Sequence, residues 1–128
     1  MLDASAALEM LLRTQAGANI EARIFQRGET LHAPHLIDVE IAQVLRCYGA
    51  SGQVSPARCA EALDDWRAFR VHRYPHEALL GRLWDLRANL TAYDAAYVAL
   101  AEALDAPLLT CDARLARAPG HGAKVELA

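Results

Sequence analysis

The sequence predicts one α/β domain, with a central, mostly parallel sheet flanked by helices. Three observations predict this class. Short apolar segments that favour strands alternate with longer segments whose apolar residues recur at helical spacing. Residues 1–128 fit a single domain and contain no internal repeat, low-complexity run or long linker. Their hydrophobic fraction of 54% argues against disorder and is sufficient for a buried core.

The first half of the chain is expected to contain two strands and three helices. In order they are the strand end Met1 to Asp3, the helix Ser5 to Leu12, the helix Ile20 to Arg27, the strand Leu31 to Ala33 and the helix Leu36 to Tyr48. Apolar residues at helical spacing indicate the helices. Gly28, Pro34 and the sequence GASG are expected to end three of these elements.

The second half opens with a helix that Ser55 and Pro56 start, because Ser caps free N–H groups while Pro fits the first turn. This helix is expected to reach about Arg70. The following elements are expected to be the strand Val71 to Tyr74, the helix His76 to Arg87, the helix from its cap Thr91 to about Leu104, the strand Pro107 to Cys111, the helix Ala113 to Arg117 and the strand Lys124 to Leu127.

Apolar residues at helical spacing also predict a buried face on the segment His76 to Arg87. The residues expected on that face are Leu79, Leu80, Leu83, Trp84 and Leu86. The aromatic residues Trp66, Phe69 and Tyr74 are interpreted in the same way, as core or interface residues.

Charge and cysteine content limit the classes of function. The formal net charge is −3, so the free chain has no excess of basic residues to attract nucleic acid. Two bound divalent cations would turn that balance from −3 to +1. Cys47, Cys59 and Cys111 are odd in number and widely spaced, which is typical of small buried residues in a reducing compartment. Because no export signal is present, the cytoplasm is the expected location.

Four acidic residues lie where a strand-like segment gives way to a helix. They are Asp3, Glu40, Asp94 and Asp112, in the contexts LDASA, DVEIA, TAYDAAY and LLTCD. Each has an explanation that needs no function, because a carboxylate in the first turn of a helix can cap N–H groups and complement the helix dipole. Thr91 and Asp94 have the spacing of a capping box, and Asp38 competes with Glu40 for any role at its helix end.

The joint placement of the four acids indicates a shared site. In an open parallel α/β sheet, the carboxyl ends of strands and the amino ends of the following helices lie along one edge, where such folds place their sites. Two carboxylates brought together there repel each other by about 4 kcal/mol at a separation near 4 Å and an effective dielectric near 20. A hard cation with oxygen ligands, Mg²⁺ or Mn²⁺, would offset this repulsion.

DASA near the start, VEIAQVLR, RANLTAYDAAYVALAEAL and the strand end LLTCD together resemble a PIN-domain ribonuclease, and specifically a VapC-type toxin of a bacterial toxin–antitoxin pair. The resemblance implies an α/β/α domain, endonucleolytic cleavage of RNA that depends on Mg²⁺ or Mn²⁺, a homodimer, and neutralisation by a cognate antitoxin. By motif, the implied catalytic and metal-binding acids are Asp3, Glu40, Asp94 and Asp112, with Ser5 and Thr110 as polar helpers. A water activated by bound metal is expected to attack the backbone phosphorus.

Two other features qualify this expectation. Arg87 and Asn89 precede the Asp94 helix and are candidates for contacts with RNA phosphates, with a solvated helix end as the alternative. Members of the family usually carry several apolar strand residues before the first Asp, whereas only Met1 and Leu2 precede Asp3. Either the first strand is short or the native chain starts earlier.

Two other functions stay open from the sequence. A PIN-like domain can serve mainly as a protein-interaction module that holds a partner in the groove formed by its first helices, its acids then acting as caps or receiving an Arg. A PIN nuclease can also act in RNA maturation, outside any toxin pair. Metal binding by the isolated protein separates the module from the nucleases. A small antitoxin gene immediately upstream separates the toxin from the maturation enzyme.

Overall fold

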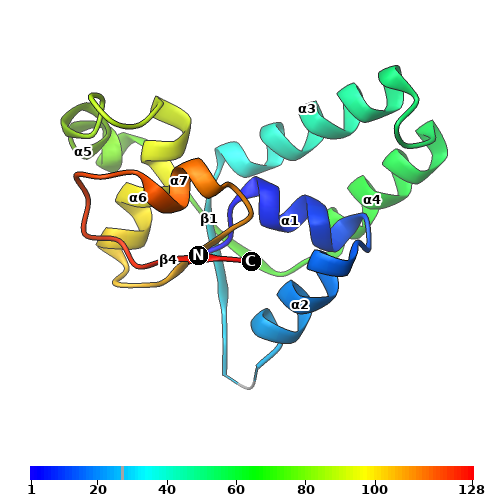
Figure 1. The fold of residues 1–128 in the computed structure, drawn as a ribbon, viewed down its shortest axis with the longest axis horizontal. Helices are drawn as coiled ribbons and strands as arrows, with labels where there is room; N and C mark the ends of the chain where they lie inside the picture. The colour runs from blue at the N-terminus through cyan, green and yellow to red at the C-terminus, as the bar shows by residue number, and fades with distance from the viewer. Residues whose placement is uncertain (27) are drawn as a thin grey trace.

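The computed structural model describes residues 1–26 and 28–128, with parallel strands at its centre (Figure 1). Strand β1 (Leu31–Pro34) pairs with β2 (Val71–Tyr74), and β3 (Leu108–Thr110) pairs with β4 (Val125–Leu127). Both pairs are parallel, as the sequence predicts.

The N-terminal segment joins the two strand pairs. Leu2 forms a parallel bridge with Leu109, and its N–H donates to the carbonyl of His32 at 3.0 Å. The order across the sheet is therefore β2, β1, the N-terminal segment, β3 and β4. Met1 to Asp3 is thus a short central strand end, as predicted, and only one of its residues forms a bridge.

Helices α1 (Ala4–Leu11) and α2 (Gln15–Ile24) pack closely against each other. The predicted start of the second helix at Ile20 is wrong, because Thr14 caps the helix earlier by accepting the N–H of Gly17 at 3.0 Å. Its predicted end is also wrong, because α2 ends at Ile24 and not next to Gly28. Arg27, the last residue of the predicted helix, lies outside the described residues.

Helix α3 (Leu36–Ser51) is followed by α4 (Pro56–Ala68), and the two pack together. The predicted break at GASG is confirmed, because the helix ends at Gly52, whose φ of 76° suits a residue without a Cβ. The predicted last residue, Tyr48, is wrong, since α3 continues through the first glycine of GASG to Ser51. The predicted start of α4 is confirmed, since Ser55 accepts the N–H of Arg58.

The segment after β2 contains a 3₁₀ turn, η1 (Glu77–Leu79), and a short helix, α5 (Leu80–Asp85), in place of one longer helix. Leu79 and Leu86 are buried as predicted, but Leu80 is 58% exposed and Trp84 is 68% exposed. The prediction of a continuous buried face is wrong because a helix this short buries only the side that contacts its neighbour.

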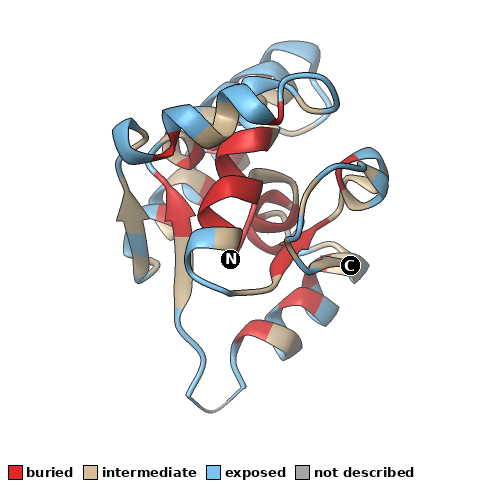
Figure 2. Ribbon diagram, turned by 90° about the vertical axis from the view of Figure 1, so that its left-hand side faces the viewer, coloured by how far each residue is buried: buried red, intermediate tan, exposed pale blue. Residues whose placement is uncertain are grey.

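Helix α6 (Ala92–Ala103) carries the centre of the core, and α7 (Ala113–Arg117) follows β3. Residues 95–101 of α6 are all buried, and the helix contacts β1, β3 and α5. Figure 1 shows α6 on one side of β1 and α1 to α4 on the other, and Figure 2 shows buried residues on the helix faces turned toward the strands. Within the described part of the chain, no helix is both long and apolar enough to cross a membrane.

Candidate functional site

The parallel strands place the predicted acids near one edge of the sheet. Helix α1 follows the N-terminal segment, α3 follows β1, and α7 follows β3. Because the strands are parallel, their carboxyl ends share an edge, so these three helices begin close to it. Asp3 and Asp112 are the N-caps of α1 and α7, while Glu40 lies one turn into α3.

Asp3 is a buried carboxylate, only 6% exposed, held by neutral donors. Its Oδ1 accepts the hydroxyl of Ser5 at 2.7 Å and the N–H of Ala6 at 2.9 Å, and its Oδ2 accepts the hydroxyl of Thr110 at 2.6 Å. Burial raises the pKa of Asp3 above its ordinary value, against the effect of these hydrogen bonds. The predicted helpers Ser5 and Thr110 therefore contact the predicted ligand directly.

The same two hydroxyls tie Asp3 to the start of α7. Ser5 accepts the N–H of Cys111 at 2.8 Å, and Thr110 accepts the N–H of Asp112 at 2.9 Å. The strand end Thr110 to Asp112 and the start of α1 are thus fixed relative to each other. Their coupling explains why LLTCD and DASA, far apart in sequence, carry residues of one network.

Glu40 points from α3 toward α6, where its Oε2 accepts the hydroxyl of Tyr97. Burial is the main cause that raises the pKa of Glu40, and the negative charges of Asp3 and Asp94 raise it further, while the Tyr97 hydrogen bond works against them. Asp3 and Asp94 therefore both lie within electrostatic reach of Glu40. Burial and the bond to Glu40 raise the pKa of Tyr97, so its hydroxyl stays a proton donor.

Asp94 and Asp112 are more open than Asp3. Asp94 is half-buried, and its Oδ2 accepts the hydroxyl of Thr91 at 2.8 Å while its N–H donates back to that hydroxyl at 3.1 Å. The Thr91 half of the predicted capping box is therefore present, whereas the Asp94 carboxylate bonds the Thr91 hydroxyl in place of its backbone N–H. Asp112 accepts the N–H of Arg114 at 2.7 Å and forms a 3.4 Å ion pair with its guanidinium. Burial opposes ionisation of Asp112, but hydrogen bonds from Arg114 and Leu115 outweigh it and lower its pKa.

The carboxylate of Asp38, the alternative to Glu40 as a site residue, is bound by side chains that link elements of the fold. Its Oδ1 accepts the indole N–H of Trp66 at 2.7 Å, and its Oδ2 lies 2.8 Å from Nε of Arg73. Burial opposes ionisation of Asp38, but these bonds, with the charge of Arg73, lower its pKa. Asp38 thus links α3 to α4 and β2, whereas Glu40 forms no ion pair with any described residue.

The structure holds the two candidate RNA-contacting residues against their neighbours. The guanidinium of Arg87 lies 4.7 Å from the ring centroid of Trp84 and donates to the Trp84 carbonyl at 2.7 Å. The side-chain amide of Asn89 lies against Gly120, where an added Cβ would come within 2.6 Å of its nitrogen. Both residues are exposed, and their role in binding stays a prediction.

The residue that sequence reasoning missed is Tyr97 of α6. Its ring is buried, and its hydroxyl donates to the Glu40 carboxylate and so holds it in place. The one available signal was chemical: a buried tyrosine hydroxyl usually needs a hydrogen-bond partner.

The carboxylate and hydroxyl groups at this edge suit a hard divalent cation, but the side chains do not form a complete coordination sphere. Among residues 1–26 and 28–128, no group of three or more His, Cys, Asp or Glu side chains is close enough to hold a metal. Yet no described Arg, Lys or His forms an ion pair with Asp3, Glu40 or Asp94. Their negative charge is balanced only by hydroxyl and amide donors, and oxygen ligands of this kind suit Mg²⁺ or Mn²⁺.

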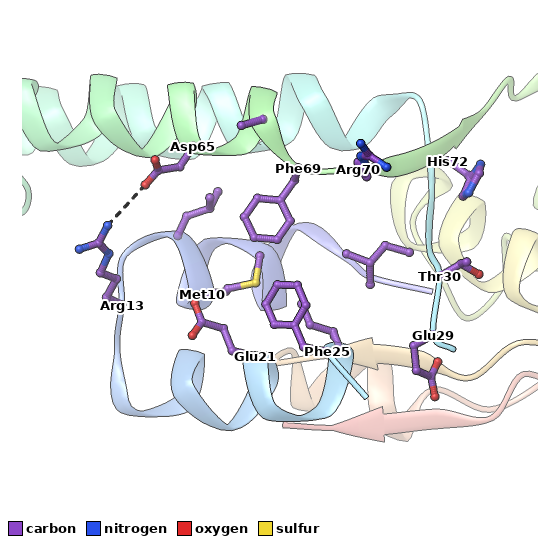
Figure 3. A pocket seen from close by; sticks show the side chains of 14 residues that line it. Met10, Arg13, Glu21, Phe25, Glu29, Thr30, Asp65, Phe69, Arg70 and His72 are labelled. Atoms are coloured by element: carbon purple, nitrogen blue, oxygen red, sulfur yellow. Dashed lines mark ion pairs between the residues drawn. The ribbon is translucent and has the colours of Figure 1, made fainter. Parts of the chain in front are cut away.

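A separate groove lies between α1, α2 and α4 (Figure 3). Its volume is about 770 Å³, and Phe25 and Phe69 face each other in it with ring centroids 6.2 Å apart. Phe25 is 65% exposed. The Arg13–Asp65 ion pair closes one end at 3.9 Å. None of the four predicted acids lines this groove.

Comparisons with known proteins agree on one family. The family described as the PIN domain matches residues 1–121. VapC ribonuclease Mb0985 of Mycobacterium bovis is 48% identical over 115 residues, which span 90% of this chain and 87% of that protein. Ribonuclease VapC12 of Mycobacterium tuberculosis is 42% identical over 127 residues, spanning 99% and 97%. The crystal structure of PAE2754 from Pyrobaculum aerophilum aligns with a TM-score of 0.66 at 28% identity, covering 89% of this chain and 74% of that one.

Proposed function

The chain belongs to the PIN-domain family and is a VapC-type ribonuclease, and from this membership we propose that it cleaves RNA at the Asp3–Glu40–Asp94 edge as the toxin of a toxin–antitoxin pair. The observation that carries the proposal is that Glu40 lies within electrostatic reach of both Asp3 and Asp94, while none of the three forms an ion pair among the described residues. Mg²⁺ or Mn²⁺ is the cation of suitable size and charge.

Each residue has a distinct part in this proposal. Asp3, Glu40 and Asp94 would hold the ion. Asp112 would bind it through Oδ2, the oxygen that does not accept the helix N–H groups, or through a water. Ser5 and Thr110 fix the buried carboxylate of Asp3 by donating hydroxyl protons to its two oxygens. A divalent ion held by these carboxylates would lower the pKa of a bound water and place a positive charge beside the phosphate.

The chain's own groups position the reaction. Water forms a bond to phosphorus, a bond from phosphorus to a ribose oxygen breaks, and that oxygen takes up a proton. A carboxylate near the water can accept the proton that the water loses, and Glu40 is suited to it because burial and the neighbouring acids raise its pKa. Tyr97 holds Glu40 by its hydroxyl and remains protonated.

A metal-rescue assay tests the proposed reaction. The purified protein is expected to cleave single-stranded RNA in Mg²⁺ or Mn²⁺, to stop when EDTA is added, and to resume when excess Mn²⁺ is restored. Cleavage that continues undiminished in EDTA contradicts a metal-dependent mechanism. A protein that binds no Mn²⁺ in calorimetry and cleaves nothing supports the protein-interaction module.

The cognate antitoxin is proposed to occupy the groove of Figure 3. An exposed Phe25 opposite Phe69, with the Arg13–Asp65 pair at the rim, has the apolar centre and charged edge of a protein-binding site. Its position away from the acids suits a partner that anchors itself there.

A binding measurement tests this docking surface. Phe25→Ala is expected to weaken binding of the protein encoded immediately upstream by about tenfold or more, because truncating an aromatic anchor removes its buried contact. Leu80→Ala, on an exposed position of α5, is the control and is expected to bind as the parent does. Equal affinities of Phe25→Ala and the parent would contradict this placement. RNA cleavage without any antitoxin gene nearby would instead favour RNA maturation.

A homodimer is the remaining part of the proposal and rests on the family. Sedimentation of the purified protein measures it directly, with a mass twice that of the 14.0 kDa chain as the expected result. A monomer at micromolar concentration would contradict it.

A further inference from the structure

A second concave surface adjoins the proposed active site, between α1 and α3 and against the start of α6. This Tyr93 cleft has a volume of about 660 Å³, and its lining includes Ser5 and Glu40. Both residues belong to the proposed site, so the cleft adjoins the proposed catalytic acids. Volumes of this size are typical of small-ligand sites.

The remaining walls of the Tyr93 cleft are mostly apolar. Leu8 lies on one side, Val39 and Val44 lie on the other, and Tyr48 and Tyr93 supply aromatic rings. Tyr93 is 65% exposed although it directly precedes Asp94 at the proposed catalytic edge. An exposed ring gains free energy when a flat partner covers it, because apolar surface leaves water and the rings stack.

The charges in the cleft select which part of RNA can enter it. Glu9 and Glu40 are the charged residues of the lining, and both are acidic, so a phosphate would be repelled. A nucleobase is neutral, flat and largely apolar on its faces, and every base can stack on a tyrosine ring. The side-chain amide of Gln43 adds one polar group that can contact a base edge.

We propose that the Tyr93 cleft binds an unpaired nucleobase next to the scissile phosphate, with Tyr93 stacked on that base as a substrate-positioning residue. The inference rests on the proposed nuclease function and deepens it by assigning a base-contacting residue beside the proposed catalytic acids. A base in a duplex is already stacked and paired, so it cannot enter the cleft while its phosphate lies at the acids. Cleavage is therefore confined to loops and single strands.

Steady-state kinetics on a single-stranded RNA oligonucleotide test the proposal. Tyr93→Ala is expected to raise KM by about 5- to 150-fold, the range for loss of one stacked base, with a smaller effect on kcat. Tyr93→Phe keeps the ring and is expected to retain the parent KM. Leu80→Ala, an exposed apolar residue outside the cleft, is the matched control.

An abasic substrate locates the contact. When the nucleotide beside the cleavage position lacks its base, the parent is expected to lose affinity as Tyr93→Ala does, and Tyr93→Ala is expected to lose nothing more. If the losses of affinity from the abasic substrate and from Tyr93→Ala add, or if Tyr93→Ala keeps the parent KM, the proposal is overturned. So would a change from dimer to monomer in Tyr93→Ala, because the cleft would then be covered by a second copy.

The failure of this inference is distinguishable from failure of the nuclease function. If Asp94→Asn abolishes cleavage while Tyr93→Ala cleaves with the parent KM, the proposed nuclease function is supported and the proposed base-binding role of the cleft is overturned. If the folded parent cleaves no RNA in Mg²⁺ or Mn²⁺, both are overturned.

Discussion

Acidic residues in this protein acquire different roles from the partners that surround them. Asp38 faces Arg73 and the indole of Trp66, whereas the hydrogen bonds to Asp3 and Glu40 from described residues come from hydroxyl and amide donors. A paired carboxylate is already compensated, but an unpaired, partly buried one favours a cation. Of the two acidic residues of α3, Asp38 is therefore structural and Glu40 is a candidate ligand.

Removing the Tyr97 hydroxyl tests how Glu40 is held. Tyr97→Phe leaves the Glu40 carboxylate without its donor from α6, so Mn²⁺ affinity is expected to fall by about 10- to 100-fold, as for other residues that orient a ligand. Calorimetric titration with Mn²⁺ measures this. Tyr74→Phe is the matched control, because it removes a hydroxyl that lies 2.9 Å from His32 at the opposite strand pair. Parent-like affinity in Tyr97→Phe would contradict a positioning role.

Neutralising Asp38 tests its separation from the site. Asp38→Asn weakens the bonds to Arg73 and Trp66, and the free energy of unfolding is expected to fall by about 1 kcal/mol, because the pair is partly exposed. Mn²⁺ affinity is expected to stay within about twofold of the parent value. Urea denaturation and calorimetry measure the two quantities. A large loss of Mn²⁺ binding with unchanged stability would make Asp38 a ligand.

Sequence was informative about residues whose role follows from local context. Asp3, Asp94 and Asp112 were predicted at helix starts because capping depends on neighbours within three positions. Asp3 and Asp112 are the N-caps of α1 and α7, whereas Asp94 lies in the first turn of α6, which Thr91 caps. The choice between Glu40 and Asp38 was not accessible, since it depends on Tyr97 and Arg73, which lie far away in the chain.

Helix ends were predictable from the sequence where local residues determine them, and not where contacts with distant segments do. The start of α4 and both ends of α6 were predicted within one or two residues, because Ser55-Pro56 and Thr91 act locally. Helix α2 begins earlier than expected because its first turn is fixed by packing against α1 and by Thr14. The segment of η1 and α5 has helical spacing throughout, yet Trp84 remains exposed because only one side of it meets α6.

Two glycines on different helices provide a matched test of the α1–α2 contact. A Cβ on Gly17 would lie 2.2 Å from the Glu9 carbonyl oxygen, so Gly17→Ala is expected to lower the free energy of unfolding by about 1–3 kcal/mol or more. A Cβ on Gly81 of α5 meets nothing within 4 Å, so Gly81→Ala is expected to stabilise by about 0.5–1 kcal/mol. Chemical denaturation measures both. Equal changes of the same sign in the free energy of unfolding of the two variants would contradict the close contact between α1 and α2.

At the scale of the whole molecule, the two ends of the chain complete the sheet. The N-terminal ammonium donates to the Pro107 carbonyl at 2.8 Å, and Leu2 joins β1 to β3. The C-terminal strand β4 covers the outer side of β3. Near the C-terminus, Glu102 of α6 accepts the N–H of Gly122 at 2.8 Å, so long-range polar contacts fix this segment as well.

Acid sensitivity of the fold follows from Glu102. Hydrogen bonds from Arg82 at 2.7 and 2.9 Å are the largest cause that lowers the pKa of Glu102 to about 2. Because the folded pKa lies below the unfolded one, this stability is fully present above about pH 4.5 and is lost as the pH falls toward 2.

Thermal melting at a series of pH values tests this linkage. Relative to the parent, Arg82→Gln is expected to be less stable at pH 6, and the difference is expected to shrink between about pH 4.5 and 2. A constant difference across this range would show that the Arg82 contact acts by packing alone.

The central claim is that carboxylates at the sheet edge perform metal-dependent RNA cleavage, and Asp94→Asn tests it most directly. Asparagine retains an oxygen that can accept the Thr91 hydroxyl, so the cap of α6 and the melting temperature are expected to persist while the charge is lost. In Mg²⁺, with cleavage ends mapped, the folded variant is expected to cleave RNA about 100-fold more slowly or not at all. Cleavage by folded Asp94→Asn at the parent rate would contradict the account.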